Sequence, residues 1–342
     1  MTNGLREADY YEVVDEENNI VKCTLCPLLC ELRPNEKGKC KARMNIGGKL
    51  YSLIYGFVTM KIDHIEKQGF YHFLPGARVQ TFATYNCNLD CIFCPVADKS
   101  QIDPEKIVGK QYPPDQAVMF GLASGSKIIC FGDGEPLIAF EWVRETAKLA
   151  KERGLKVVIK TNGYFNEEPI REILEYVDGV MIEMKGVTED DYIKNCTRGG
   201  PEPVKSTIKV IHSAEKHIEI SLILHEELGN DAASAEVLAN WIVNELSKDV
   251  PFHLTRLLPA YKTMQLQPTS QKLLEEAYDV AKESGLHYIY LDNVPGHKYA
   301  NTYCPHCGEE LITRTAFSTE VRRVSLQGQC NKCQAQTSII MK

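Results

Sequence analysis

Residues 87–94 read CNLDCIFC and directly follow VQTFATY (79–85), a run of the kind that forms a buried β-strand. The thiols of Cys87, Cys91 and Cys94 therefore share one short loop. A structural zinc ion or a closed iron–sulfur cluster takes four protein ligands, and this loop supplies only three. Three thiolates suit a [4Fe–4S] cluster with one iron left open; the alternative is a group of ordinary buried core cysteines.

Composition and charge place the chain among ordinary globular proteins. Of its 342 residues, 44% are hydrophobic and 25% are charged, and the net charge is −7 without a basic block. This argues against nucleic acid or an anionic membrane as the main partner. Residues 1–19 are polar and lack the apolar core of a signal peptide, and no apolar run is long enough to span a bilayer. The sequence therefore predicts a cytoplasmic protein.

From residue 79 onward, short apolar runs alternate with amphipathic segments. Strand-like runs lie at 79–85, 127–131, 156–160, 179–184, 217–224, 252–258 and 287–291. Helix-like segments lie at 140–154, 234–248 and 270–285. This alternation predicts a parallel sheet built from right-handed β-α-β units. We therefore expect an α/β fold, a partial (β/α)6 TIM-like barrel, over residues 77–298.

The remaining cysteines form two further groups, and only Cys130 and Cys196 stand alone among the thirteen. The two quartets are Cys23, Cys26, Cys30 and Cys40, and Cys304, Cys307, Cys330 and Cys333. C-x2-C elements in a cytosolic chain are typical of metal sites. The first quartet, in an N-terminal module over 1–76, suits zinc, one iron or an auxiliary [4Fe–4S] cluster. The second, over 299–342, suits a zinc-ribbon or rubredoxin-like module that binds zinc or iron.

The loop after the second predicted strand reads FGDGEP (131–136) and contains Gly132, Asp133, Gly134 and Glu135. Glycines permit a sharp turn and a close approach of the backbone to a ligand, and a glutamate accepts hydrogen bonds from an ammonium group. Active residues of barrels lie on the loops after the strands, so this loop is a candidate ligand site. An ordinary strand-to-helix turn is the alternative.

Polar residues also end the third and fourth predicted strands. Lys160 and Asn162 lie in KTNG (160–163), where the Asn side chain can hydrogen-bond a ribose, although a helix-entry turn explains the same residues. Glu183 and Lys185 flank an apolar residue and point the same way from a strand. They form either a pocket pair that contacts a ligand or an ion pair that closes the barrel end.

Two further candidate cofactor contacts follow the fifth and sixth predicted strands. Arg256 lies at a strand end, where a guanidinium suits a carboxylate ligand. His225 follows the fifth strand, and His253 lies on the sixth. For each single histidine, a structural role with satisfied hydrogen bonds is the simpler interpretation.

With these motifs assembled, the chain resembles the radical S-adenosylmethionine (SAM) superfamily. Within it, the chain is similar to AmmeMemoRadiSam-system radical SAM proteins, relatives of pyruvate formate-lyase activating enzyme. The segments that carry the likeness are CTLCPLLC (23–30), KLYSLIYG (49–56), FYHFLPG (70–76), CNLDCIFC (87–94), KTNGY (160–164), FHLTRLLPAYK (252–262), NVPGH (293–297) and TYCPHCG (302–308). Two departures stand out: Pro95-Val96 replaces a Gln-Asn pair, and DGEPL (133–137) replaces an Asn-Glu-Pro-Thr element.

The resemblance implies a function and roles for these residues. Cys87, Cys91 and Cys94 would hold a [4Fe–4S] cluster whose open iron binds SAM. An electron from an external flavodoxin- or ferredoxin-like reductant would cleave SAM to methionine and a 5′-deoxyadenosyl radical. That radical would abstract hydrogen from a carbon of a protein or peptide substrate. The loop around Glu135 would contact the methionine amino group, and Asn162 would lie beside the ribose.

Three outcomes stay open at this point. The substrate radical could be stored as a glycyl radical on a partner enzyme, which would make the protein an activase. It could instead be methylated in a cobalamin-dependent reaction on a protein residue. No Asp-x-His-x-x-Gly element for cobalamin is present, but some superfamily members bind cobalamin without one. A non-catalytic iron–sulfur electron carrier is the third alternative, and it requires a fourth protein ligand for the central cluster. Exposed iron–sulfur chemistry also predicts an oxygen-sensitive protein from an anaerobic setting.

Overall fold

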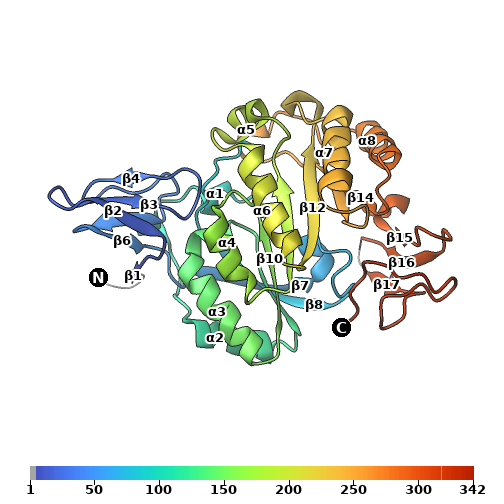
Figure 1. Ribbon diagram of the computed structural model, residues 1–342, viewed down its shortest axis with the longest axis horizontal. Helices are drawn as coiled ribbons and strands as arrows, with labels where there is room; N and C mark the ends of the chain where they lie inside the picture. Colours follow the sequence, from blue (N-terminus) through green and yellow to red (C-terminus); the bar gives the residue numbers. More distant parts are fainter. Residues whose placement is uncertain (1–4, 317) are drawn as a thin grey trace.

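The computed structural model describes residues 5–316 and 318–342, and its centre is one eight-stranded sheet. The strands follow the order β14-β13-β12-β11-β10-β9-β8-β7 (Figure 1). They are β7 (Val58–His64), β8 (Arg78–Thr84), β9 (Ile128–Phe131), β10 (Lys156–Thr161), β11 (Gly179–Met184), β12 (His217–Leu224), β13 (Phe252–Arg256) and β14 (Ile289–Asp292). Strands β8 to β14 are parallel, and β7 is antiparallel to β8. Within the described residues β7 and β14 do not pair, so the barrel is open on one side.

Helices connect the parallel strands, which confirms the predicted α/β partial barrel. They are α1 (Ala97–Ser100), α2 (Pro114–Ala123), α3 (Phe140–Glu152), α4 (Glu167–Leu174), α5 (Glu189–Cys196), α6 (Pro201–Ser213), α7 (Ala232–Glu245) and α8 (Gln271–Glu283). The predicted strands at 179–184 and 217–224 match β11 and β12 residue for residue. Both strands are nearly continuous buried runs, as expected of a parallel sheet that is covered on both faces.

Alternate residues of each strand enter two different cores. On β9, Ile129 and Phe131 pack in the large core between the sheet and its helices, while Ile128 and Cys130 pack in a smaller core inside the barrel. The period of two follows from the pleat, which sends successive side chains to opposite faces. The smaller core also contains residues of the segment before β8: Ile65, Phe70 and Phe73. This segment therefore closes the amino-terminal end of the barrel and leaves its carboxyl-terminal end open for a site.

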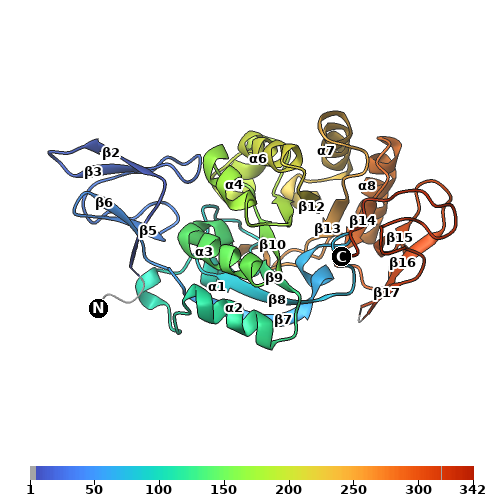
Figure 2. The ribbon, with the colours of Figure 1, turned by 60° about the horizontal axis from the view of Figure 1, so that its bottom comes forward.

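The N-terminal module consists of two small antiparallel sheets at one end of the long axis (Figures 1 and 2). One contains β1 (Arg6–Glu7), β6 (Lys49–Ser52) and β5 (Arg43–Ile46), and the other contains β2 (Tyr11–Asp15), β3 (Ile20–Cys23) and β4 (Glu31–Leu32). Strand β7 belongs to the large sheet although it lies before residue 76, where the sequence analysis ended the module. The barrel sheet thus begins earlier in the chain than the predicted boundary.

A buried ion pair fastens this module to the barrel. Arg43 Nη2 lies 2.6 Å from Glu141 Oε1 of α3, and each side chain is 1% exposed. Arg43 also donates to the carbonyl of Asp9 at 2.7 Å, and the Asp9 amide donates to the same Glu141 oxygen at 2.9 Å. A buried charge without a partner is costly, so the pair fixes how the module docks.

The C-terminal module forms a three-stranded sheet at the opposite end of the molecule (Figure 1). Its strands are β15 (Thr302–Tyr303), β16 (Glu310–Arg314) and β17 (Thr319–Val321). The last residues return to the barrel, where the Ile340 amide donates to the carbonyl of His72 at 2.8 Å. In the described part of the chain, no helix has both the length and the apolar character needed to cross a membrane.

The docking pair yields a stability prediction. Replacing Glu141 with Ala leaves the Arg43 guanidinium buried without its carboxylate, and we expect a loss of about 3–5 kcal/mol in the free energy of unfolding. Urea denaturation measures this change. Glu7→Ala is the matched control, because its pair with Lys49 is exposed at 46% and 56% and should contribute far less to stability than the buried pair. Equal effects of the two substitutions would contradict the assignment.

Candidate active site

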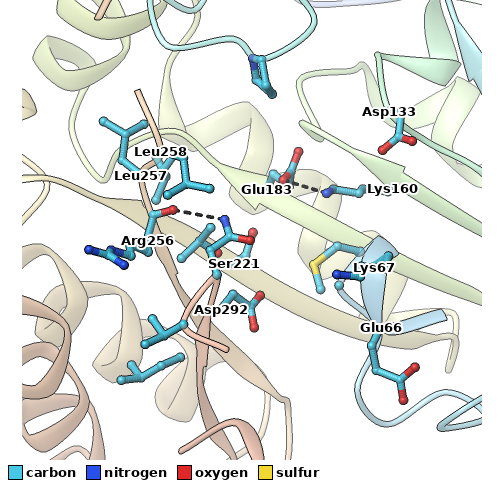
Figure 3. A pocket seen from close by; sticks show the side chains of 18 of the residues that line it. Glu66, Lys67, Asp133, Lys160, Glu183, Ser221, Arg256, Leu257, Leu258 and Asp292 are labelled. Carbon is cyan, nitrogen blue, oxygen red and sulfur yellow. Dashed lines mark hydrogen bonds and ion pairs between the residues drawn. The ribbon is translucent and has the colours of Figure 1, made fainter. Parts of the chain in front are cut away.

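A pocket of about 490 Å³ opens at the carboxyl-terminal ends of the parallel strands. One wall is the cysteine loop, with Cys87, Cys91 and Cys94 all lining the cavity. Most of the other residues predicted from sequence line it as well: Asp133, Gly134, Glu135, Lys160, Asn162, Glu183, Lys185 and Arg256. Figure 3 shows charged side chains from several strands in this space. The strand-end loops of the barrel therefore bring residues as distant in the chain as Cys87 and Arg256 into one site.

Side chains of neighbouring loops hold the cysteine loop in place. Asn88 Nδ2 donates to the carbonyl of Tyr164 at 2.7 Å, and Asn162 Nδ2 donates to Asn88 Oδ1 at 2.8 Å. The Ile92 amide donates to the carbonyl of Asn195 at the end of α5 at 2.8 Å. Asn162, predicted to contact a ribose, thus also braces the loop that carries the three thiols.

The FGDGEP loop adopts the backbone that its glycines suggest. A Cβ atom on Gly134 would lie 2.6 Å from the carbonyl oxygen of Thr84, so only glycine fits at this position. Asp133 has a φ of 53°, a left-handed conformation that favours glycine and that Asp tolerates better than most residues. Its carboxylate pairs with Lys61 of β7 at 2.6 Å. The ion pair with Lys61 helps to hold Asp133 in a backbone conformation that favours glycine.

Glu135 is committed to the protein itself. It is 1% exposed and accepts hydrogen bonds from Thr161 Oγ1 at 2.7 Å, the Asn162 amide at 2.8 Å and the Leu137 amide at 3.2 Å. Burial raises the pKa of this carboxyl to about 7, although the hydrogen bonds oppose the shift. The sequence analysis predicted that Glu135 accepts hydrogen bonds from an ammonium group. In the structure its carboxylate connects two strand-end loops, and the residue also lines the pocket.

Lys160, Glu183 and Lys185 form one half-buried ionic group. Glu183 lies 3.2 Å from Lys160 Nζ and 3.4 Å from Lys185 Nζ (Figure 3). Burial would raise the pKa of Glu183, but the two lysines outweigh it and lower the pKa to about 2. Two ammonium groups on one carboxylate leave a net positive charge on this wall. The Glu183–Lys185 pair is thus an ion pair whose members line the pocket, and its contact with a ligand stays a prediction.

Two predicted contacts need correction, and a third, Arg256, is engaged elsewhere. His225 is not among the pocket-lining residues, because its ring is used structurally: Nε2 lies 2.9 Å from the carbonyl of Gln267, and Nδ1 accepts from the Glu227 amide at 3.1 Å. Gly132 is not among the lining residues either. Arg256 lines the rim, but its Nε donates to the carbonyl of Thr269 at 2.9 Å and its guanidinium points away from the pocket centre (Figure 3).

The sequence analysis missed a buried chain of ionisable groups that ends in the pocket. Glu219 on β12 is completely buried and lies 2.9 Å from both His217 Nε2 and His253 Nε2. His253 Nδ1 lies 3.1 Å from Asp292, whose carboxylate lines the cavity (Figure 3). Burial alone would lower the pKa of His253, but Asp292 and Glu219 outweigh it and raise the pKa to about 9. The imidazolium is therefore clamped between two carboxylates. Asp292 directly follows three apolar residues of β14, and only its place at a strand end could have drawn attention to it.

The C-terminal module contributes to the same pocket. Arg314 of β16 is 5% exposed, lies 4.2 Å from the ring centre of Tyr71, and donates to the Tyr71 carbonyl at 2.6 Å. Burial and then the neighbouring Asp292 carboxylate raise the pKa of Tyr71 well above its usual value. Residues 314–316, 318 and 319 line the cavity on the side where the barrel is open. The module therefore supplies a wall that the barrel lacks.

Comparisons with known proteins agree with this geometry. The model of the radical SAM superfamily matches residues 81–232, the span from the cysteine loop to the start of α7. An uncharacterized protein of Methanocaldococcus jannaschii is 32% identical over 339 residues, covering 98% of this chain and 100% of that protein. The chain belongs to the radical SAM superfamily. The membership predicted from the cysteine loop is thus confirmed, and the protein is a radical SAM enzyme.

Two further relatives of this radical SAM chain are informative. The pyruvate formate-lyase-activating enzyme of Clostridium pasteurianum is 27% identical over 208 residues, which cover 57% of this chain and 83% of that enzyme. Among solved structures, a radical SAM methyltransferase from Sphaerobacter thermophilus aligns with 84% of this chain and 76% of its own, with a TM-score of 0.50 and 12% identity. At that identity the likeness shows a shared fold only.

The pocket fits the two groups that the radical SAM family implies, a [4Fe–4S] cluster and SAM. Three thiols face the cavity, and none of the other described residues that line it is a cysteine. A cluster held by Cys87, Cys91 and Cys94 would thus keep one iron without a protein ligand, facing the pocket. The positive group around Glu183 suits the carboxylate of SAM. Pro95 and Val96, the departures from the family subgroup, also line the cavity.

The two outer quartets differ in how completely the structure assembles them. The Sγ atoms of Cys304, Cys307, Cys330 and Cys333 all lie within 4.8 Å of one another, as a tetrahedral metal site requires. In the N-terminal quartet, a Cβ atom on Gly38 would lie 3.8 Å from the Sγ atoms of both Cys30 and Cys40. Burial and then the neighbouring Cys23 thiolate raise the pKa of Cys40 to about 11. Metal binding at this quartet stays a prediction.

The clamped imidazolium predicts a pH-dependent stability. The pKa of His253 is raised to about 9 in the folded protein, against about 6.5 when unfolded. Its contribution is therefore fully present below about pH 6.5 and is lost as the pH rises through about 9. We expect the difference in unfolding free energy between the wild type and His253→Gln to shrink by on the order of 3 kcal/mol between pH 6 and pH 9.5.

Urea denaturation at both pH values measures this effect. His287→Gln is the control, because this ring meets Asp249 at the surface, where the side chains are 22% and 49% exposed. Its effect should stay within about 1 kcal/mol at either pH. A constant difference for His253→Gln across the range would contradict the clamped, protonated ring.

The C-terminal quartet predicts a structural metal. Replacing Cys307 with Ser removes one of four thiolate ligands, so we expect about one metal ion per chain to be lost and the melting temperature to fall. Elemental analysis and calorimetry measure both quantities. Cys130→Ser, which removes a buried thiol outside all three cysteine groups, should leave the metal content unchanged. An unchanged metal content in Cys307→Ser would argue against the site.

Proposed function

We propose that this radical SAM enzyme abstracts hydrogen from a carbon of a protein or peptide substrate and thereby modifies it. The observation that carries the proposal is one pocket with two chemically different ends. One end holds the three thiols of Cys87, Cys91 and Cys94 and the positive Lys160–Glu183–Lys185 group. The other end holds Asp292, backed by His253, and a wall from the C-terminal module. The first end suits the cofactors and the second a substrate.

When bound, the cluster and SAM would supply one-electron cleavage of SAM to methionine and a 5′-deoxyadenosyl radical. The chain's own residues would position the cysteine loop, bind the ligand and limit the access of water to the pocket. Asn88 and Asn162 fix the cysteine loop through their mutual hydrogen bond. Lys160 and Lys185 would attract the carboxylate of SAM. The backbone at Gly134 permits close approach of a ligand. Leu257, along with other apolar residues of the rim, limits the access of water.

The substrate class rests on relatives and on the shape of the site. Proteins with sequence similarity to this chain include pyruvate formate-lyase-activating enzymes. The pocket has a volume of about 490 Å³, and residues of the C-terminal module form part of its wall. This shape suits a chain segment inserted from a larger partner. An activase that leaves a glycyl radical on a partner enzyme is therefore our preferred form of the proposal, with a flavodoxin- or ferredoxin-like protein as electron donor. Methyl transfer with cobalamin is the alternative product outcome, and none of the contacts described above favours it.

The test is SAM cleavage by protein reconstituted with iron and sulfide under anaerobic conditions and reduced with dithionite. The wild type should form 5′-deoxyadenosine, and Cys87→Ala, Cys91→Ala or Cys94→Ala should reduce the rate to background, because one cluster ligand is lost. Cys130→Ala, a buried thiol outside the pocket, should retain the activity. The absence of 5′-deoxyadenosine from wild-type protein with an intact cluster would refute the radical chemistry.

The product distinguishes the two forms of modification. A glycyl radical on a co-purified partner, detected by electron paramagnetic resonance, would support the activase. Formation of S-adenosylhomocysteine alongside 5′-deoxyadenosine would instead show methyl transfer.

A further inference from the structure

A fourth thiol lies beside the cysteine loop. Cys196, the last residue of α5, has its Sγ atom 2.9 Å from Cys91 Sγ. This separation is shorter than ordinary contact between non-bonded atoms, about 3.5–4.0 Å even for the smaller carbon, and longer than a disulfide bond of about 2.05 Å. Both cysteines are free thiols. A movement of about 1 Å would therefore join them.

The chain holds the two sulfur atoms together through its backbone. The Ile92 amide donates to the carbonyl of Asn195 at 2.8 Å, and the Asp90 amide donates to the carbonyl of Cys196 at 3.3 Å. These bonds lie on either side of Cys91 in the loop and at the end of α5. The Asn195 side chain is anchored in turn, donating to the carbonyl of Leu228 at 2.9 Å. The approach of the two thiols is thus built into the docking of the loop.

The two thiols differ in access. Cys91 lines the pocket, whereas Cys196 is completely buried and lies outside the lining. Cys196 therefore stands behind Cys91 as seen from the cavity. It does not supply a fourth cluster ligand that faces the pocket, and the proposed cluster leaves it without a role.

We propose that Cys91 and Cys196 form a reversible disulfide when the protein lacks its cluster, with Cys196 as the resolving cysteine. A hydroperoxide entering the pocket would reach Cys91 before Cys196, which is completely buried. The Cys91 thiol would attack the peroxide oxygen while its proton passes to the leaving oxygen, forming a sulfenic acid and releasing water. The Cys196 thiol would then attack the Cys91 sulfur, and the sulfenic oxygen would leave as a second water. Two thiols lose two electrons and two protons, and one hydrogen peroxide becomes two water molecules.

The disulfide would protect a cluster ligand that cannot be replaced. Oxidation of Cys91 beyond the sulfenic acid gives a sulfinic acid, which a dithiol does not reduce, and the [4Fe–4S] site would be lost permanently. A disulfide is restored by a dithiol reductant, and the loop can then be reloaded with iron. Among the described residues, Cys87 and Cys94 have no such thiol neighbour outside their own loop: their sulfur atoms make polar contacts with Leu89, Asn88, Asn162 and Ser100.

Peptide mapping of the full chain tests the proposal. The chain is stripped of iron, reduced, desalted, treated with one equivalent of hydrogen peroxide, alkylated and digested with trypsin. Cleavage leaves Cys196 in the tetrapeptide NCTR (195–198) and the three loop cysteines in residues 79–99. We expect these two peptides to be linked in wild-type protein, with fragmentation placing the bond at Cys91. Recovery of alkylated NCTR beside sulfinic acid at Cys91, or a bond to Cys87 or Cys94, would overturn the assignment.

Variants give a second measurement that depends on the same bond. After peroxide and then dithiothreitol, reconstituted wild type should regain its cluster absorbance, while Cys196→Ala should regain at least about 5-fold less because Cys91 is over-oxidised. Cys130→Ser removes the other solitary cysteine, also completely buried, and should behave as wild type. Circular dichroism shows whether Cys196→Ala is folded. Equal recovery in all three proteins would also overturn the proposal. Neither measurement uses SAM, so its outcome is independent of the proposed enzymatic activity.

Discussion

A single buried carboxylate holds much of the barrel interior together. Glu219 has no exposure to solvent, yet it accepts hydrogen bonds from the backbone amides of Tyr71 and His72 and contacts two histidine rings. A buried charge is tolerated only when it is paired and fully hydrogen-bonded. The requirement to satisfy Glu219 therefore fixes the segment that closes the barrel end against β12 and β13. Through His253, the same requirement determines where Asp292 stands in the pocket.

This arrangement explains what could be predicted from the sequence. Strands and helices follow from local apolar patterns, so β11 and β12 were located to the residue. The cysteine loop could be recognised because three identical ligands at fixed spacing are rare without a metal. Asp292 carries no comparable pattern, since its importance comes from its contact with His253, far away in the chain. Such contacts depend on tertiary packing, which a single sequence does not display.

Two predicted residues whose side chains are engaged by the protein itself make the same point in the other direction. Glu135 and His225 each lie at the end of a strand, where barrel enzymes carry active groups. In both cases the side chain is occupied by nearby backbone amides or carbonyls. Position at a strand end therefore makes a role in the pocket possible but does not decide it. The number of local partners that compete for the side chain decides whether it remains available to a ligand.

The wall formed by residues 314–316, 318 and 319 has a consequence for how this protein can diversify. In the described part of the chain, the strands beside this wall, β16 and β17, pair within the C-terminal sheet and form no ladder with the barrel strands. The shape of one side of the pocket is thus encoded outside the part of the chain that carries the three thiols. Insertions or substitutions in the hairpin of β16 and β17 could remodel the cavity while the cysteine loop and its supports stay intact. Radical generation and the fit of a partner are, in this architecture, separable traits.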